Sequence, residues 1–388
     1  MTHIYGIDET GLEHVSTATE IAGKIRGQAP EVDKAATFPQ AAITMLADRG
    51  LLGLCVPADC GGQGQSPGVF AGVVEQLSQA CPSTAMFYVM HVSASQAFVA
   101  SDTLDRRKAL LKDVAAGKHL TTLAFSEHGS RSQFWAPVSQ LREDGNDGFL
   151  TTASKSWVTS ANHADSYVAS AQKPDAASPL ESTLYVVRRT ADGVTISGCF
   201  DGLGLRGNDS APVEFAAVAI RQSDLLTAQG EGAKMMLEVV LPWFVVGTAA
   251  MAHGLCLAAV NATRTHLSGV GFAHDDTRLR DLPVLRARVA EMSCHTEQSR
   301  ALLGFTTRQM LAPDEQTPLF VLQSRLAALE AALHVTDLAM KACGGAAFSR
   351  HLGVEQMFRD ARAGWVMAPT VDHLRDFVGR ALTGLPLF

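Results

Sequence analysis

Hydroxyl, glycine and aromatic side chains gather in two short segments near the middle of the chain. Residues 125–132 read FSEHGSRS, and residues 155–165 read KSWVTSANHAD. A glycine-containing loop that follows a strand can present backbone N–H groups and hydroxyls to an anionic or heteroaromatic ligand. The indole of Trp157 next to the hydroxyl of Thr159 offers a flat apolar face beside a hydrogen-bond donor. Each feature alone is common in turns and cores, but the combination suits the ring of a flavin.

Three regions of different periodicity have to position these segments. Residues 1–118 carry apolar side chains at helical spacing, whereas residues 119–229 contain short β-rich runs separated by turn residues. Residues 230–388 are helical again. The longest helical patterns there cover 285–312, 316–343 and 366–382. The sequence therefore predicts an α+β chain of three domains, with a small antiparallel barrel or sandwich in the middle.

Composition excludes several classes of partner. Of the 388 residues, 47% are hydrophobic and 18% are charged, which is typical of globular proteins. A net charge of -7 provides no basic surface for nucleic acid. The seven cysteines lack CxxC spacing, a pattern that favours reduced thiols in the cytoplasm over disulfides or a metal site.

One segment has the composition of a membrane span. Residues 239–260 contain no Asp, Glu, Lys or Arg, but Pro242, Thr248 and His253 interrupt the apolar run. We interpret it as a helix buried on all sides in a bundle, without membrane insertion. The first fifteen residues have no apolar signal core, so we expect a cytoplasmic protein.

Four segments, in order, resemble the acyl-CoA dehydrogenase family. The first resembles its T-E-P-G-x-G-S-D loop, and residues 155–165 resemble K-x-W-I-T-N-x-x-x-A-D. Residues 202–210 (GLGLRGNDS) are similar to G-x-R-G-S-D-T, and residues 344–362 carry G-G and F-R-D-A-R where the family has G-G and Y-R-D-A-R. The resemblance covers essentially the whole chain. It implies an N-terminal helical domain, a middle antiparallel β-barrel and a C-terminal four-helix bundle, with FAD rather than FMN between barrel and bundle.

The resemblance also implies site residues. The flavin would contact Phe125, Ser126, Ser132, Trp157, Val158, Thr159 and Thr370, while Gly344 and Gly345 would approach the FAD of a neighbouring subunit. The substrate pocket would comprise Ser132, Phe134, Trp135, Trp243, Phe244, Met367 and Ala368. No metal ligand is expected. We interpret Glu127 as a structural residue that ties its loop to neighbouring backbone. We expect Arg206 and Asp209 to form an ion pair that steadies a turn, and we expect the same of Arg359 and Asp360, with helix packing as their main role.

The resemblance breaks at the catalytic base. The family removes a proton α to a thioester carbonyl while a hydride leaves the β carbon, and a buried carboxylate suits the proton transfer. Ala368 occupies one position that normally supplies this carboxylate, and Phe244 occupies the other. Arg131 and Gln133 replace a Gly and an Asp of the flavin loop, and the R-x-x-F-G motif is absent from residues 265–283.

Three interpretations remain open. A substitute base could act, with Asp372 the first candidate and His373, Glu238 and His91 as others. Reduced flavin could instead activate O₂ and hydroxylate an aromatic or amine substrate, or the protein could bind FAD or a ligand without turnover. The expected partners are a small molecule such as an acyl-CoA, an electron-transfer protein or flavin reductase, and further copies of the chain in a dimer or tetramer.

Overall fold

The structure is a computed structural model that describes residues 3–145 and 148–387. Helices form its first part: α1 (Glu9–Ile25), α2 (Ala29–Ala35), α3 (Gln40–Asp48), α4 (Pro67–Ser78), α5 (Pro82–Ala100) and α6 (Arg107–Ala115). Local sequence explains two of the helix starts. Ser66 caps α4 through its hydroxyl, and Pro67 and Pro82 occupy first-turn positions where a missing N–H costs nothing.

Two sheets form the middle of the chain. The strands are β1 (Thr121–Ala124), β2 (Leu141–Glu143), β3 (Gly148–Val158), β4 (Ser166–Gln172), β5 (Ser182–Arg188), β6 (Val194–Ile196) and β7 (Ala211–Arg221). One sheet has the order β1-β4-β5 and the other β2-β3-β7-β6. All pairs are antiparallel except β1 with β4, which run parallel because the chain passes through the other sheet between them. Alternate side chains of β3 are buried between the sheets, as the two-residue repeat requires.

Helices form the last part as well. They are α7 (Gly232–Met235), a π-helical turn (Met236–Val240), α8 (Leu241–Gly269), α9 (Pro283–Gln309), α10 (Thr317–Cys343), α11 (Gly345–Phe348), α12 (Val354–Val366) and α13 (Val371–Thr383). The helix predicted over 366–382 begins only at Val371. Pro369 has no N–H to continue α12, and the Thr370 hydroxyl accepts a hydrogen bond from the His373 N–H as the cap of α13.

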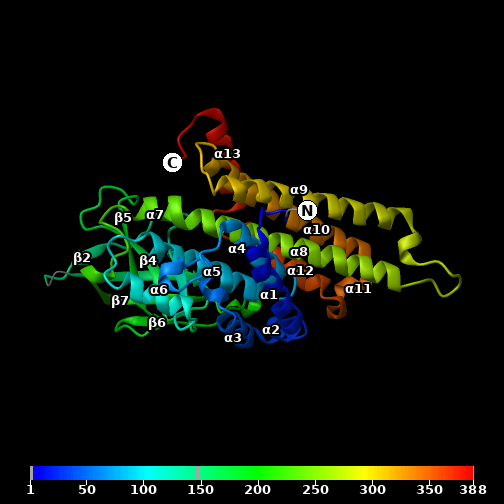
Figure 1. Cartoon of the computed structure of the whole chain (residues 1–388), viewed down its shortest axis with the longest axis horizontal. Helices are drawn as coiled ribbons and strands as arrows, with labels where there is room; N and C mark the ends of the chain where they lie inside the picture. The colour runs from blue at the N-terminus through cyan, green and yellow to red at the C-terminus, as the bar shows by residue number, and fades with distance from the viewer. Residues whose placement is uncertain (1–2, 146–147, 388) are drawn as a thin grey trace.

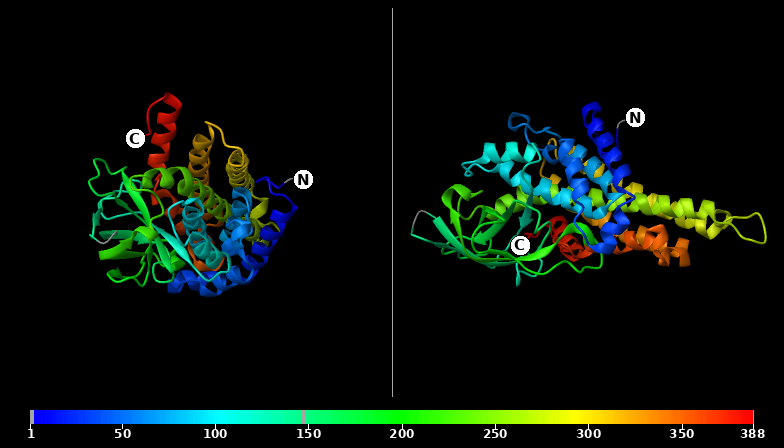
Figure 2. Two further views of the ribbon diagram at one scale, coloured as in Figure 1. Left: turned by 60° about the vertical axis from the view of Figure 1, so that its left-hand side comes forward. Right: turned by 90° about the horizontal axis from the view of Figure 1, so that it is seen from below.

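The sheets lie at one end of the molecule, and the long helices α8, α9 and α10 extend away from them (Figures 1 and 2). The N-terminal helices and the C-terminal helices share one hydrophobic core, whereas the sheets enclose a second core. The connections between α6 and β1 and between β7 and α7 contain the predicted boundaries at 118/119 and 229/230. The predicted α+β class, with helices, then strands, then helices, is confirmed.

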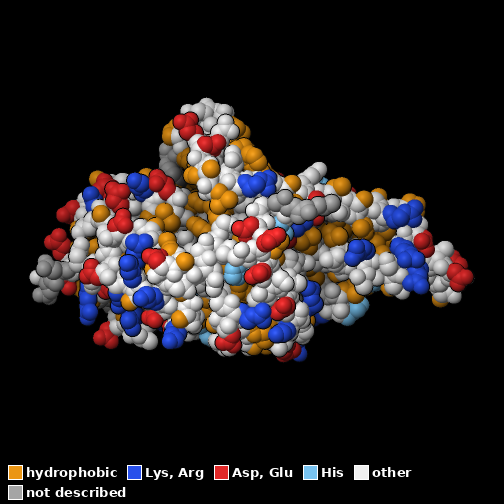
Figure 3. Space-filling view, viewed as in Figure 1, with side chains coloured by type: hydrophobic (Ala, Val, Ile, Leu, Met, Phe, Trp, Pro, Cys, Tyr) orange, Lys and Arg blue, Asp and Glu red, His pale blue; other side chains and the backbone are white. Residues whose placement is uncertain are grey.

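The apolar segment around residues 239–260 lies mostly inside the molecule. Helix α8 packs against α4, α5, α9, α10 and α12. The described part of the chain contains one stretch, Gly232–Gly269, that is long and apolar enough to cross a membrane, and 61% of its most apolar window is buried. Acidic and basic side chains are both spread over the surface seen in Figure 3.

Candidate active site

A cavity of about 690 Å³ lies where the sheets meet the C-terminal helices. This volume is in the range of small-molecule sites. Its walls come from the loop after β1, the end of β3, the loop 200–210, helix α5, the start of α8 and the end of α12 with the residues that follow it. Segments from all three parts of the sequence therefore build one site.

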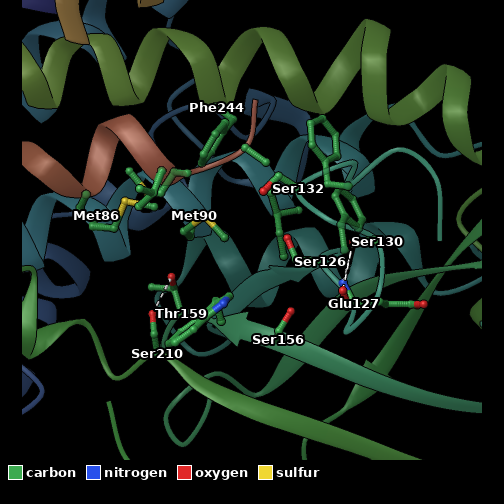
Figure 4. A pocket seen from close by; sticks show the side chains of 18 of the residues that line it. Met86, Met90, Ser126, Glu127, Ser130, Ser132, Ser156, Thr159, Ser210 and Phe244 are labelled. Atoms are coloured by element: carbon green, nitrogen blue, oxygen red, sulfur yellow. Dashed lines mark hydrogen bonds between the residues drawn. The ribbon is translucent and has the colours of Figure 1, made fainter. Parts of the chain in front are cut away.

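The strand side of the cavity is polar because a loop runs beside β3. The Ser156 N–H donates to the Ser126 carbonyl at 2.9 Å, and the His128 N–H donates to the Ser154 carbonyl at 3.0 Å. These bonds place the Ser126 side chain on the same wall as Thr159, whose hydroxyl lies 3.3 Å from that of Ser210 (Figure 4). The wall thus offers several hydroxyl donors to a ligand.

A buried ion pair fixes this loop. Lys155 is fully buried, and its Nζ donates to Glu127 Oε1 at 2.5 Å and to the Ser170 carbonyl at 2.6 Å. Glu127 also accepts hydrogen bonds from the Val138 N–H and from the N–H and hydroxyl of Ser139. Burial alone would raise the pKa of Glu127, but Lys155 and Ser139 hold that pKa below its usual range. The structural role predicted for Glu127 is confirmed.

The helix side of the cavity is apolar. Met86 and Met90 come from α5, Phe244 from α8, and Met367 and Ala368 from the segment after α12. Figure 4 shows Phe244 reaching from α8 toward the cavity, on the side opposite Thr159 and Ser210. A ligand would lie between a hydrogen-bonding wall and an apolar wall.

Trp157 supplies a flat surface at the cavity edge. Its backbone has a positive φ of 56°, which is unfavourable for a bulky residue, and its side chain remains 68% exposed. The Phe200 ring is in edge contact with it at 6.0 Å. An exposed indole beside several hydroxyls fits the faces and edges of an isoalloxazine ring, so the residues present fit a flavin.

The structure brings together most of the predicted site residues. The cavity is lined by Phe125, Ser126, Ser132, Phe134, Trp157, Thr159, Phe244, Met367 and Ala368. Others lie elsewhere: Val158 is in the sheet core, Trp243 packs on Phe70, and Trp135 packs on His373 and Phe377. Thr370 caps α13. Gly344 and Gly345, between α10 and α11, are at the end of the molecule away from the sheets (Figure 1).

The candidate bases named from the sequence do not line the cavity. The Asp372 side chain is 79% exposed and contacts Arg375 on the surface of α13. Glu238 is exposed, and His91 is fully buried between the Leu52 carbonyl and the Thr121 N–H. His373 stacks on Phe377.

Among the described residues that line the cavity, the ionisable side chains are Glu127, His128 and Arg131. Glu127 is committed to Lys155, and Arg131 cannot accept a proton. The exposed His128 is therefore the one ionisable side chain of this described lining that is able to accept a proton and is not held in a buried ion pair.

The predicted Arg206–Asp209 ion pair is wrong. Arg206 binds the Asp201 carboxylate at 3.2 Å, whereas Asp209 accepts hydrogen bonds from Asn162 and contacts His163 at 2.9 Å. Asp209 has a left-handed backbone (φ 52°), which directs its carboxylate toward the turn at 162–163.

The predicted Arg359–Asp360 ion pair is also wrong, whereas the packing role expected for these two residues of α12 agrees with their contacts. Consecutive residues of a helix point about 100° apart, so these two side chains reach different partners. Arg359 forms a two-pronged contact with Asp33 at 2.6 and 3.0 Å, and Asp360 Oδ1 accepts from the Leu205 N–H at 2.6 Å. Both contacts join segments far apart in sequence and close the cavity near Gly204 and Leu205.

Sequence patterns did not identify several residues of the site. Met86 and Met90 are four positions apart and share one face of α5, but α5 is apolar on every side, so the spacing carried no signal. Asn208 and Ser210 lie in the segment matched to G-x-R-G-S-D-T. They line the cavity because the folded loop 200–210 forms part of its wall, which the sequence alone does not show.

Family models match three consecutive parts of the chain. The acyl-CoA dehydrogenase N-terminal domain matches residues 15–118, its middle domain residues 122–218 and its C-terminal domain residues 230–383.

Individual relatives agree with these matches. The human mitochondrial short-chain specific acyl-CoA dehydrogenase is 27% identical over 340 residues, which cover 86% of this chain and 80% of that one. Cyclohex-1-ene-1-carbonyl-CoA dehydrogenase of Geobacter metallireducens is 25% identical over 92% of this chain and 94% of its own. Butyryl-CoA dehydrogenase from Megasphaera elsdenii has the same fold, with a TM-score of 0.92, 18% identity and coverage of 97% and 99%.

Proposed function

Because the chain belongs to the acyl-CoA dehydrogenase family, we propose that it is an FAD-dependent oxidoreductase that introduces a double bond between the α and β carbons of an acyl thioester. The observation that supports this most is the cavity between sheets and bundle, with hydroxyls and an exposed indole on one wall and apolar side chains on the other. The domains would be residues 1–118, 119–229 and 230–388.

FAD, when bound, supplies a two-electron acceptor for the hydride. Trp157 would pack against the flavin ring, and the hydroxyls of Ser126, Ser132 and Thr159 would donate hydrogen bonds to its polar edge. Met86, Met90 and Phe244 would exclude water from the acyl chain, which strengthens every polar contact in the site.

The α proton needs an acceptor, and we propose the neutral imidazole of His128 for it. His128 follows Ser126 by two residues and its backbone is fixed to β3, so its side chain is carried by the same wall that would hold the flavin. Ala368 cannot take a proton, and Asp372 lies outside the cavity.

An anaerobic titration tests the proposal. FAD-loaded protein is mixed with a panel of acyl-CoAs, and the absorbance of oxidised flavin is followed. If the protein is a dehydrogenase, the substrate reduces the flavin and the absorbance of oxidised flavin falls. We expect His128→Gln to slow bleaching on the order of 10²-fold, because a general base contributes about that much, and Asp372→Asn to leave the rate unchanged. Equal rates in wild type and His128→Gln would remove His128 from the proton transfer.

A reduced-flavin hydroxylase is the second candidate. One observation favours it: the described lining of the cavity contains no carboxylate other than the paired Glu127, and oxygen chemistry on flavin needs a dry pocket more than a carboxylate base. No acyl-CoA would then bleach the flavin. Instead, protein reduced with dithionite would form a flavin–oxygen adduct, seen as a transient absorbance band when O₂ is added.

We also propose a cytoplasmic homo-oligomer, dimer or tetramer, that exchanges electrons with an electron-transfer protein or, as a hydroxylase, with a flavin reductase. Apolar side chains exposed on the C-terminal helices and their connections support the oligomer. They include Leu311 (60%) and Phe348 (85%). Sedimentation of the purified protein would give its oligomeric state.

A further inference from the structure

Arg325 is a buried cation without a partner anion. It lies in α10 with 0% of its surface exposed, and its Nη2 donates to the Met367 carbonyl at 3.0 Å. Its Nε and Nη1 have no hydrogen-bond partner among the described residues. Burial lowers the pKa of Arg325 to about 9, and no carboxylate of the described chain opposes that effect.

The other fully buried cation of the described chain and the buried Glu75 both have counter-ions. Lys155 pairs with Glu127, and Arg300 holds both oxygens of Glu75 at 2.8 and 2.9 Å. An isolated ion in a protein interior costs several kcal/mol unless it is paired and hydrogen-bonded. The exception at Arg325 therefore suggests that its counter-ion comes from outside the chain.

The position of Arg325 indicates where that anion would bind. The guanidinium carbon lies 4.7 Å from the centre of the Phe244 ring, and the carbonyl it binds belongs to Met367. Phe244 and Met367 both line the cavity, so Arg325 lies directly behind this part of the cavity wall. The next residue, Ala368, leaves this end of the cavity without a carboxylate.

We propose that Arg325 binds an acidic group carried by the acyl chain, so that the preferred substrates are thioesters of dicarboxylic acids. The proposal rests on the acyl-thioester function given above and specifies its substrate class. The half-buried Phe244 ring turns aside, and the substrate carboxylate replaces it against the unpartnered Nε and Nη1 donors. The same site rejects a methyl end, because that would leave the guanidinium unpaired.

Binding of a matched pair of CoA esters tests this inference. Glutaryl-CoA and pentanoyl-CoA have acyl chains of the same carbon number but end in a carboxylate and a methyl group. We expect FAD-loaded wild type, studied anaerobically by calorimetry, to bind glutaryl-CoA at least about tenfold more tightly than pentanoyl-CoA. Arg325→Met should abolish this preference while the Kd for pentanoyl-CoA stays the same. Arg325→Lys keeps the charge and should retain most of the preference.

The outcomes separate this inference from the proposed function. Protein that holds FAD and binds both esters equally contradicts the role of Arg325 alone. Protein that binds neither FAD nor any acyl-CoA contradicts the proposed function and this inference with it. If Arg325→Met does not fold, Phe244→Leu decides: uncovering the guanidinium should maintain or increase the preference for glutaryl-CoA, and a loss of preference would overturn the assignment.

Discussion

The indole of Trp157 is held at the cavity by a backbone conformation that costs free energy. A left-handed bulky residue is a strained arrangement, which persists where surrounding structure over-determines it. Here the hydrogen bonds between β3 and the loop after β1, together with the buried Lys155, fix the strand next to Trp157. The strain is thus located beside the surface proposed to hold the flavin.

Replacing this indole should weaken cofactor binding. We expect Trp157→Ala to raise the Kd for FAD about tenfold, because an aromatic stacking contact contributes about 0.5–1.5 kcal/mol beyond its buried area. Titration of flavin fluorescence measures the change. Trp365→Ala removes an indole of α12 that lies outside the cavity lining, where it faces Arg375. It should bind FAD like wild type, and an equal loss in both variants would contradict the role of Trp157.

Helix α8 of the C-terminal region packs closely against the N-terminal helices α4 and α5, and glycines of α8 lie at the contact. A Cβ at Gly247 would lie 2.8 Å from the Val89 methyls, and one at Gly254 would lie 2.6 Å from the Glu75 carbonyl oxygen and Ser78 Cβ. These distances explain how α8 can approach α4 and α5 so closely, and thus how Phe244 reaches the cavity.

A methyl group at Gly254 should therefore destabilise the protein. We expect Gly254→Ala to lower the free energy of unfolding by about 1–3 kcal/mol, since backbone atoms of α4 would have to move. Gly269→Ala is the matched control, because it lies at the end of the same helix with open space around it. It should leave stability unchanged or slightly increased. Urea unfolding of both variants tests the difference, which should be absent if the packing at Gly254 is loose.

Periodicity predicted elements well where local rules decide. The helix over 316–343 matches α10 within one residue, and the charge-free segment 239–260 is the core helix that its interruptions by Pro242 and His253 suggested. Local rules failed where tertiary contacts decide. The partners of Arg206 and Asp360 lie across segment boundaries, and the isolation of Arg325 is visible only once α10 is packed.

All three parts of the molecule meet at one place, through contacts among Asp33, Leu205, Arg359 and Asp360. Asp33 follows the first turn of α2, Leu205 belongs to the loop before β7, and the other two belong to α12. The Asp360 carboxyl is 1% exposed, and burial raises its pKa to about 7. The joint therefore depends on a carboxyl that favours its neutral form.

This carboxyl should give the protein a characteristic pH dependence. An ordinary Asp titrates near pH 4, so between about pH 4 and 7 the folded state holds a proton that the unfolded state releases. The contribution of the Asp360 carboxyl to the free energy of unfolding is fully present below about pH 4 and is lost as pH rises through 7. Asp360→Asn keeps a neutral side chain with an oxygen for the Leu205 N–H. At pH 8 we expect it to be more stable than wild type by on the order of 1 kcal/mol or more, with a smaller gap at pH 5.

Thermal unfolding at both pH values measures this gap. Asp376→Asn, on the exposed face of α13 beside Arg380, should follow the wild-type pH profile. A gap that does not change with pH would show that Asp360 is ionised in the folded state throughout.

The π-helical turn at Met236–Val240 contains one residue more per turn than the helix that follows it. A lineage can gain or lose a residue there while α8 keeps its orientation in the bundle. Residues of this chain and of such a relative that match by position in the sequence then differ by one position from those that match in space. Counting assigns Phe244 to a position where the family resemblance implies a carboxylate. The residue that is equivalent to that position in space can be a neighbour of Phe244.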